Sequence, residues 1–375
     1  MSSEVEAALR TVPRHLFLPG VPLEEAYANK AVITKRDEHG IDISSVSGPG
    51  IIAFMLDQLR IEPGHRVLEI GSGGYNAALL KELVGPDGDV TTIDIEQEVI
   101  DRTNKGLAAA GYQDVRALRA DGEFGAKEFA PFDRIIVTVG SWDIPPSWVN
   151  QLTEGGRLVV PLRLRGQTRS IAFERKGKHL TSRDYELCGF VPMQGAGENR
   201  EPLVLLHGEE VGLRVDDGQS VNPELLSQAL LQPRAEAWSG VTVSRKEPFS
   251  DLYLWLATAV PRFCRLVAQK SALEKGLLPR SYRPPVIFDD DSFGYLALRP
   301  CDVEKSTFEF GVYAHGPSAE KIAKEYAGQI QVWDRDHRSG PGPRFAVHPA
   351  GTPDDQLPDG RVIDKRHTRV TISWP

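Results

Sequence analysis

The sequence predicts an α/β protein with a parallel β-sheet, and three observations support this fold class. An apolar run at 67–70 passes through a loop of small residues into an apolar stretch at 77–80, which is typical of a buried strand followed by a helix. Strand-like and helix-like stretches alternate from residue 65 to residue 161, as in sheets whose strands are joined by helices. The near-continuous apolar run at 132–139 is typical of a central strand covered on both faces.

The loop after the first strand consists of Gly71, Ser72, Gly73 and Gly74. Glycine permits a positive φ and lets a ligand approach the backbone, because it has no Cβ to prevent either. A strand-to-helix turn without a ligand would use the same residues. The loop alone therefore fits both a nucleotide-like cofactor site and a structural turn.

Acidic residues follow the second expected strand, at 89–96. An acid at the tip of this strand in a doubly wound sheet can accept hydrogen bonds from both ribose hydroxyls of an adenosine. Asp94 is placed for that role beside Ile95, and Glu96 is a weaker candidate. The second strand thus supports the cofactor interpretation of the glycine loop.

A third strand-like segment, 115–122, ends in Asp121 and Gly122. A short acid can accept a hydrogen bond from the exocyclic amine of adenine, and glycine lets the ring lie close to the backbone. These two residues are expected to lie beside an adenine ring.

Two classes of enzyme fit these features: dinucleotide-dependent oxidoreductases and S-adenosylmethionine-dependent methyltransferases. The dinucleotide motif requires a glycine at its sixth position, where this chain has Asn76. Glu69 precedes the loop, and its carboxylate would repel a pyrophosphate but attract the sulfonium and ammonium groups of S-adenosylmethionine. The residues favour the methyltransferase. Its expected cofactor site comprises Glu69, Ile70, Gly71, Ser72, Gly73, Asn76, Asp94, Ile95, Asp121 and Gly122.

Several short motifs follow one another in the first half of the chain: VPRHLF at 12–17, AY at 26–27, SVSGP at 45–49, VLEIGSGGY at 67–75, ADG at 120–122, FDRIIVTV at 132–139 and GFVPM at 189–193. Together, over residues 5 to about 200, they resemble the protein-L-isoaspartate O-methyltransferase family. The resemblance implies a Rossmann-like, seven-stranded methyltransferase sheet. It also implies S-adenosyl-L-methionine as methyl donor, S-adenosyl-L-homocysteine as product, and a peptide carboxylate as acceptor.

The resemblance assigns the active-site hydroxyl to Ser47. Apolar residues at helical spacing predict a helix in the segment that follows Pro49, so Ser47 can alternatively be the N-cap of that helix. Both roles are compatible, because a helix N-terminus is a favourable place for a carboxylate. The candidate substrate-binding residues are Ser45, Val139, Gly140 and Ser141.

The implied chemistry needs no general base, because a carboxylate with a pKa near ~4 is already ionised at neutral pH. Proximity and a dry, shaped site can account for much of the rate. The next backbone nitrogen then attacks the methyl ester, releasing methanol and closing a succinimide. Esters of aspartate and of isoaspartate give the same ring, so only substrate selection separates repair from installation of isoaspartate.

The chain departs from the family pattern in its glycine loop and in its length. GSGGY is one residue shorter than the family's GxGxGY, and the chain continues to residue 375 beyond GFVPM. These departures favour the homologues of lanthipeptide biosynthesis, which methylate an aspartate in a ribosomally made peptide and lead through succinimide to isoaspartate. The alternatives are repair of isoaspartate in damaged proteins and a non-catalytic peptide-binding partner with a vestigial cofactor site.

Length predicts two domains. The first is a catalytic domain at 1–200, with an N-terminal segment at 1–60 and a Rossmann-like core at 61–200. The second is a separate α+β domain at 201–375, expected to recognise the peptide, with dimerisation or stabilisation as the alternative. Its patterns predict strands at 203–206, 292–298, 307–313 and 368–374, and helices at 318–330 and at 249–267, where Pro261 ends or kinks the helix.

Composition narrows the classes of partner. The net charge is −8, from 44 basic and 52 acidic residues, which argues against nucleic acid. The basic run at 163–178 is expected to be a solvated hairpin face, with contact to an acidic peptide as the alternative. Three separated cysteines and nine histidines show no metal or disulfide pattern. A polar N-terminus without long apolar runs predicts a cytoplasmic protein without membrane contact. The expected partner is a peptide or protein with Asp or isoAsp, and the oligomeric state is not predicted.

Overall fold

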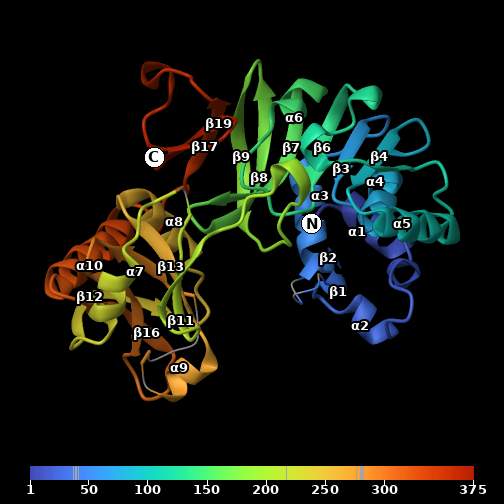
Figure 1. Ribbon diagram of the computed structural model, residues 1–375. Coiled ribbons are helices and arrows are strands. Elements are labelled where there is room, and N and C mark those ends of the chain that lie inside the picture. The colour runs from blue at the N-terminus through green and yellow to red at the C-terminus, as the bar shows by residue number, and fades with distance from the viewer. Residues whose placement is uncertain (37, 39, 41, 217, 276, 279–282) are drawn as a thin grey trace.

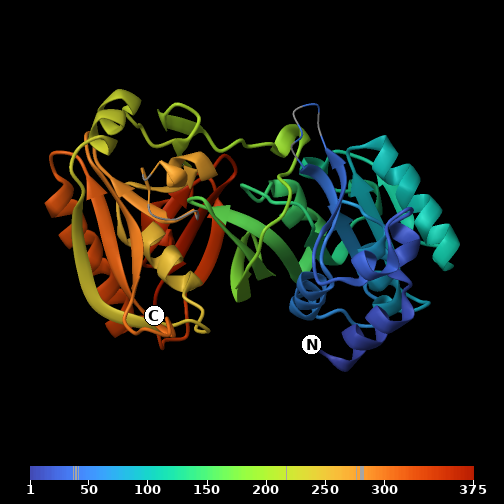
Figure 2. The same ribbon diagram turned by 90° about the horizontal axis from the view of Figure 1, so that it is seen from below.

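Two large β-sheets organise the chain, one in each half of the molecule (Figure 1). The computed structural model describes residues 1–36, 38, 40, 42–216, 218–275, 277–278 and 283–375. Figure 2 shows the halves side by side, with green strands of the first sheet reaching towards the second half. No helix in these described ranges is both long enough and apolar enough to cross a membrane.

The first sheet has a parallel part, which confirms the predicted α/β class. Its five parallel strands occur in the order β5, β4, β3, β6, β7. Two antiparallel strands, β8 and β9, follow at the β7 edge. The bounds are β3 (Arg66–Ile70), β4 (Asp89–Asp94), β5 (Arg116–Arg119), β6 (Phe132–Val137), β7 (Leu152–Leu164), β8 (Gln167–Lys176) and β9 (His179–Leu187).

Helices cover both faces of this sheet, because alternate strand residues point to opposite sides. Val67 packs into a core with α1, α3 and α4, whereas Leu68 packs into a second core with Trp148 of α6. The helices are α1 (Ser3–Thr11), α2 (Leu23–Tyr27), α3 (Pro49–Leu59), α4 (Tyr75–Val84), α5 (Gln97–Ala110) and α6 (Pro146–Gln151). A small hairpin, β1 (Val32–Arg36) and β2 (Asp42–Val46), and the 3-10 turns η1 (Arg14–Phe17), η2 (Gly122–Phe124) and η3 (Lys127–Phe129) complete this part.

The second sheet is antiparallel, with the order β10, β11, β13, β14, β15, β16, β12. Helices α8 and α10 pack on one face and α7 packs on the other. The strands are β10 (Leu203–His207), β11 (Val211–Arg214), β12 (Ala235–Ser244), β13 (Phe263–Ala268), β14 (Pro285–Phe288), β15 (Phe293–Pro300) and β16 (Thr307–His315). The helices are α7 (Pro223–Leu230), α8 (Ser250–Ala259), α9 (Lys270–Glu274) and α10 (Ala319–Asp336).

The last three strands return to the first sheet, which has ten strands instead of the seven expected. β17 pairs with β9 through Val347 and Leu180. The edge of β9 offers unpaired backbone groups that a further strand can satisfy. The predicted strand at 368–374 therefore lies outside the second sheet, and the expected separate domain at 201–375 is not one continuous unit. The added elements are β17 (Arg344–Pro349), β18 (Arg361–Asp364), β19 (Thr368–Ser373) and the turns η4 (Gly195–Gly197) and η5 (Asp354–Gln356).

One local prediction is confirmed in part. The helix expected at 249–267 ends at Ala259, as expected from Pro261, which has no N–H and restricts the residue before it; the rest of this stretch forms β13 instead of a helix. Gly155 and Gly156 lie within the continuous strand β7, although a pair of glycines is typical of a turn. There the pairing with β6 is irregular, so the extra residues are absorbed as a bulge.

The basic hairpin β7–β8 is not a solvated face at its tip. Arg165 is only 3% exposed and Arg169 is fully buried. The guanidinium of Arg165 donates to the carbonyl oxygens of Ala257, Val260 and Pro261 at the end of α8, at 2.6, 2.9 and 2.8 Å. A cation is favourable there, because the last carbonyls of a helix have no partners within the helix. The hairpin tip thus joins the two halves.

We expect Arg165→Met to lower the free energy of unfolding by about 2–4 kcal/mol, because it leaves buried carbonyls without donors. Urea titration followed by tryptophan fluorescence measures this change. The exposed Arg335→Met on α10 is the matched control and should change stability by less than about 0.5 kcal/mol. Equal stability of the two variants would contradict the role of the hairpin tip.

Candidate functional site

The glycine loop lies at the carboxyl end of β3, between the ends of β4 and β6. Gly71 has φ of +93°, and a Cβ there would lie 2.9 Å from both Thr138 Oγ1 and Val139 Cγ1. Its N–H donates to the carbonyl oxygen of Ile93 at 2.9 Å, and the Thr138 hydroxyl donates to the Gly71 carbonyl oxygen at 2.5 Å. Only glycine fits this position, and the loop is fixed to the neighbouring strands.

Glu69, the last residue but one of β3, is fully buried beneath the loop. Its carboxylate accepts hydrogen bonds from Asn76 Nδ2 at 2.8 Å and from the Thr92 hydroxyl at 2.6 Å. Burial, only partly offset by these bonds, raises the pKa of Glu69 to about 7. Asn76 Oδ1 is buried and has no hydrogen-bond partner among the described residues. These acceptor atoms can bind a cation or a hydrogen-bond donor.

Asp94 fixes the loop from the end of β4. Its Oδ2 accepts from the N–H of Ser72 and its Oδ1 from that of Glu96, both at 2.9 Å. Burial raises the pKa of Asp94, although these two bonds favour the ionised form. The Ser72 hydroxyl lies 3.0 Å from the Thr103 hydroxyl of α5. Asp94 therefore has a structural role in addition to the expected ribose contact.

A segment from beyond β9 packs on Asp121 and Ile95. The N–H groups of Glu123 and Ala196 donate to the Asp121 carboxylate at 3.0 and 2.8 Å. A Cβ at Gly195 would lie 2.7 Å from Ile95 Cδ1. The turn η4 thus forms a wall of this part of the site.

Ser47 follows β2 and precedes α3, whose N-cap is Gly48. The prediction that Ser47 is the N-cap is wrong, because the first turn is capped by Asn29, whose Oδ1 accepts from the Gly50 N–H at 2.8 Å. The Ser47 hydroxyl makes no hydrogen bond with another described residue. Buried Arg14 donates to the carbonyl oxygen of Val46, at 3.4 Å, and so holds the residue before Ser47. The backbone before Ser47 is thus held in place, while the Ser47 hydroxyl has no hydrogen-bond partner among the described residues.

A small cavity of about 30 Å³ brings the candidate residues together. Its lining includes Ser45 and Ser47 together with Glu69, Gly73 and Asn76. The described lining also contains residues that were not among the predicted site residues, namely Val46, Ile52, Met55, Tyr75, Ile136, Thr138 and Phe190. The expected catalytic serine and the expected cofactor loop therefore share one cavity.

Three expected substrate-binding residues lie outside that lining. Gly140 forms a bridge with Pro192, and its N–H donates to the Val191 carbonyl oxygen at 2.7 Å. Ser141 is buried, and its hydroxyl donates to the carbonyl oxygen of Asp143 at 2.6 Å. Val139 packs at the edge of the second core. Thr138, directly after β6, lines the small cavity instead of these three residues.

The missed residues left partial signals in the sequence. Phe190 belongs to GFVPM and Tyr75 to VLEIGSGGY, so motif matching could have included both. Thr138 is a polar residue at the end of an apolar strand, a common position for site residues in parallel sheets. No group of histidine, cysteine and acidic side chains in the described part of the chain could hold a metal ion.

A parallel sheet with a glycine loop after one central strand and acids after the next two defines the class: an S-adenosylmethionine-dependent methyltransferase fold. The chain belongs to the protein-L-isoaspartate(D-aspartate) O-methyltransferase family, whose model matches residues 1–198. As a member, it is a protein carboxyl O-methyltransferase that uses S-adenosylmethionine. Membership gives no support to the alternative of a non-catalytic partner.

Named relatives agree with this assignment. A protein-L-isoaspartate O-methyltransferase of Methanococcus aeolicus is 37% identical over 192 residues, which are 51% of this chain and 86% of the relative. One of Thermotoga maritima is 34% identical over 180 residues, 48% of this chain and 56% of the relative. A solved structure named protein-L-isoaspartate O-methyltransferase has a TM-score of 0.50 at 22% identity and covers 88% of this chain and 89% of its own.

The solved structure changes the interpretation of the second half. Its fold corresponds to most of this chain, so a protein with the isoaspartate methyltransferase name also extends beyond the first 200 residues. The Thermotoga relative likewise extends well beyond its matched region. Length therefore does not separate this chain from proteins of that name, contrary to our expectation.

We expect Glu69→Gln to stabilise the cofactor-free protein more at high pH than at low pH. The unfolded chain releases the Glu69 proton near pKa 4.5, whereas the folded chain keeps it up to about 7. Ionisation of Glu69 therefore removes stability as the pH rises between these values. Relative to wild type, the variant should gain about 2–3 kcal/mol in unfolding free energy between about pH 5 and about pH 8.

Urea titrations at both pH values measure that gain. The exposed Glu304→Gln is the matched control and should show no such difference between the two pH values. An equal effect of Glu69→Gln at both would show that the buried carboxyl does not titrate in this range.

Proposed function

We propose that this enzyme methylates the α-carboxylate of an isoaspartyl residue in a peptide or protein. The observation that carries the proposal is the cavity that Ser47 lines together with Glu69 and Gly73 of the glycine loop. The names of the relatives support isoaspartate as the acceptor. This is the repair function, which is the first alternative that the sequence left open.

The residues present fit the cofactor of the family. Glu69 and Asn76 Oδ1 would hold the positively charged methionine end, because they offer buried acceptors without a cation of their own. Asp94 would accept from the ribose, and Asp121 with Gly122 would contact the adenine. When bound, S-adenosylmethionine supplies an electrophilic methyl group. The protonated Glu69 of the free protein would ionise beside the bound positive charge, since an opposite charge favours the carboxylate.

Ser47 would orient the acceptor. Its unused hydroxyl can donate to one oxygen of the substrate carboxylate and leave the other oxygen to attack. The site excludes water through apolar neighbours, among which Phe190 and Met55 line the same cavity. No protein group needs to remove a proton, since the acceptor is already ionised. Succinimide closure then follows without a catalytic residue.

Methylation of an aspartate in a ribosomally made, lanthipeptide-type peptide is the second candidate. The observation that favours it is the glycine loop GSGGY, one residue shorter than the family pattern. The names of the relatives reported above refer to isoaspartate and not to peptide tailoring. We therefore rank this function below isoaspartate methylation. Both candidates use the same site and differ only in the acceptor.

We expect Ser47→Ala to lower kcat by about 10- to 100-fold, because one hydrogen bond to a charged oxygen contributes about 1.5–3 kcal/mol. The dissociation constant for S-adenosylmethionine, measured by calorimetry, should change by less than about threefold, since the assigned cofactor contacts remain. Ser220→Ala, at an exposed position, is the control. Unchanged turnover of Ser47→Ala would leave Ser47 without a role in the reaction.

Paired peptides that differ only in Asp or isoAsp test the acceptor. With enzyme and S-adenosylmethionine, mass spectrometry should show a methyl ester on the isoAsp peptide, followed by loss of methanol. Ester formation on the Asp peptide alone would replace the proposed function with the second candidate. The Ser47→Ala variant should slow whichever reaction is observed.

A further inference from the structure

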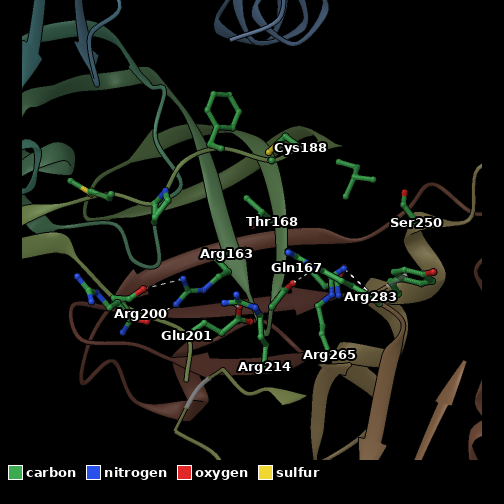
Figure 3. Close-up of a pocket in the computed structure, with 18 of the residues that line it drawn as sticks. Arg163, Gln167, Thr168, Cys188, Arg200, Glu201, Arg214, Ser250, Arg265 and Arg283 are labelled. Atoms are coloured by element: carbon green, nitrogen blue, oxygen red, sulfur yellow. Dashed lines mark hydrogen bonds and ion pairs between the residues drawn. The ribbon is translucent and has the colours of Figure 1, made fainter. Parts of the chain in front are cut away.

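A large cavity of about 1340 Å³ lies between the two halves of the molecule (Figure 3). Its lining comes from the β7–β8 hairpin tip, the segment that leaves β9, strands β11 and β13, and the start of α8. Pockets for small molecules usually measure about 300–1,000 Å³. The size of this cavity fits a segment of peptide better than the cofactor alone.

The large cavity adjoins the cavity of Ser47. Phe190 lines both, and Ile43 of β2 lines the large cavity only a few residues before Ser47. Gln194, another lining residue, donates to the Ile43 carbonyl oxygen at 3.3 Å. A peptide with its acceptor carboxylate at Ser47 can therefore continue past Phe190 into the space between the halves.

Most charged side chains of the cavity have partners. Arg163 pairs with Asp216 at 3.2 Å, and Glu247 pairs with Arg338 at 2.6 Å. Arg200 pairs with Glu198. Glu38 and Glu186 are exposed and belong to the first half. These charges do not create an excess of either sign on the wall formed by the second half.

Apart from Glu247, which pairs with Arg338, the charged described residues on the wall of the second half are three arginines and one acid. Arg214 of β11 and Arg265 of β13 lie near Glu201, and Arg283, before β14, lies beside Arg265 (Figure 3). Arg214 is 3.8 Å from Glu201, whereas Arg265 and Arg283 have no ion-pair partner within 4.0 Å among the described residues. Within the described ranges, Arg265 donates to the carbonyl oxygens of Gly166 and Arg283, both at 3.1 Å. This wall carries an excess of positive charge.

Buried donors without partners occur on this wall and on the adjoining β7–β8 hairpin tip, which carries Gln167. The Nε atoms of Arg214 and Arg265 and the Nε2 atom of Gln167 have no hydrogen-bond acceptor among the described residues. Glu201 Oε1 is the one buried acceptor of this group without a donor. Buried polar groups are normally paired, so an excess of donors fits a neighbouring group that is rich in acceptors. Guanidinium groups are well suited to carboxylates, which they bind with two parallel hydrogen bonds.

We propose that Arg214, Arg265 and Arg283 form a subsite for a second carboxylate of the peptide substrate, separate from the one that is methylated. The inference rests on the proposed function, and it assigns the substrate class: peptides with an acidic group downstream or upstream of the acceptor. The carboxylate belongs to a glutamate or aspartate side chain or to the peptide C-terminus. The subsite holds the substrate while Ser47 orients the acceptor.

Fluorescence anisotropy with labelled peptides tests the subsite. Each peptide has one isoaspartate and a pair of glutamates about three, six or nine residues away, which spans roughly 10, 20 or 30 Å when extended. The pair is placed on either side of the isoaspartate in separate peptides. Matched peptides have glutamines at those positions and an amidated C-terminus. A third set has glutamines and a free C-terminal carboxylate at the same spacing, so that the two sources are distinguished.

Wild type should bind at least one carboxylate-bearing peptide about tenfold more tightly than its amide match, as expected for a charge-assisted pair. Arg265→Gln and Arg283→Gln should each remove most of this preference. Arg283 is exposed, so its variant keeps the test valid if Arg265→Gln lowers the melting temperature. The exposed Arg335→Gln on α10 removes the same charge and should keep the preference.

Equal affinities of the acidic and amide peptides at every spacing would overturn the subsite, as would a preference that survives in both cavity variants. Ester formation on the amide peptides, followed by mass spectrometry, reports separately on the proposed function. Methylation without acid preference removes the subsite and leaves the function. Acid preference that depends on the arginines, without ester on any peptide, removes the function and leaves the subsite.

Discussion

The tip of the β7–β8 hairpin is the contact on which the arrangement of the two halves depends. Arg165 has φ of +49° and Gly166 has φ of +73°, so the turn places a non-glycine residue in the left-handed region. That conformation costs roughly 1 kcal/mol. The cost is offset because it directs the guanidinium into the carbonyl end of α8, and Gly166 donates to Asp216 at 3.0 Å. The same tip forms part of the wall of the large cavity. The contact that joins the halves therefore also shapes that cavity.

The methyltransferase site depends on buried acids that have few cations near them. Glu69 lies beneath the glycine loop and Asp94 anchors it, and burial raises the pKa of both. Such carboxyls destabilise the free protein when they ionise, and they gain most when a positively charged group binds beside them. In the proposed function, part of the binding free energy of the cofactor therefore comes from relieving an unfavourable arrangement of the free protein.

Local patterns predicted the parallel part of the first sheet, because its strands are apolar and are separated by short helices. The glycine loop, Glu69 and Asp94 could be chosen from residue type and spacing, since these contacts are close along the sheet edge, whereas Ser47 was chosen from the family resemblance. The three added strands could not be predicted in place, because β17 joins β9 across more than a hundred intervening residues. The burial of Arg165 was missed for the same reason: its partners belong to α8, and a basic run alone resembles a solvated surface.

The pairing of β17 with β9 determines how a shortened form of this chain would behave. A polypeptide that ended near residue 198, where the family match ends, would include β9 but not its neighbour β17. The open edge of β9 could then pair with the same edge of another molecule, which is a common origin of aggregation. Such a fragment would also expose the apolar side chains of β8 and β9 that Phe345 and Val347 now cover. The catalytic half is thus not expected to be an independent unit, because the C-terminal strands cover the edge of its sheet.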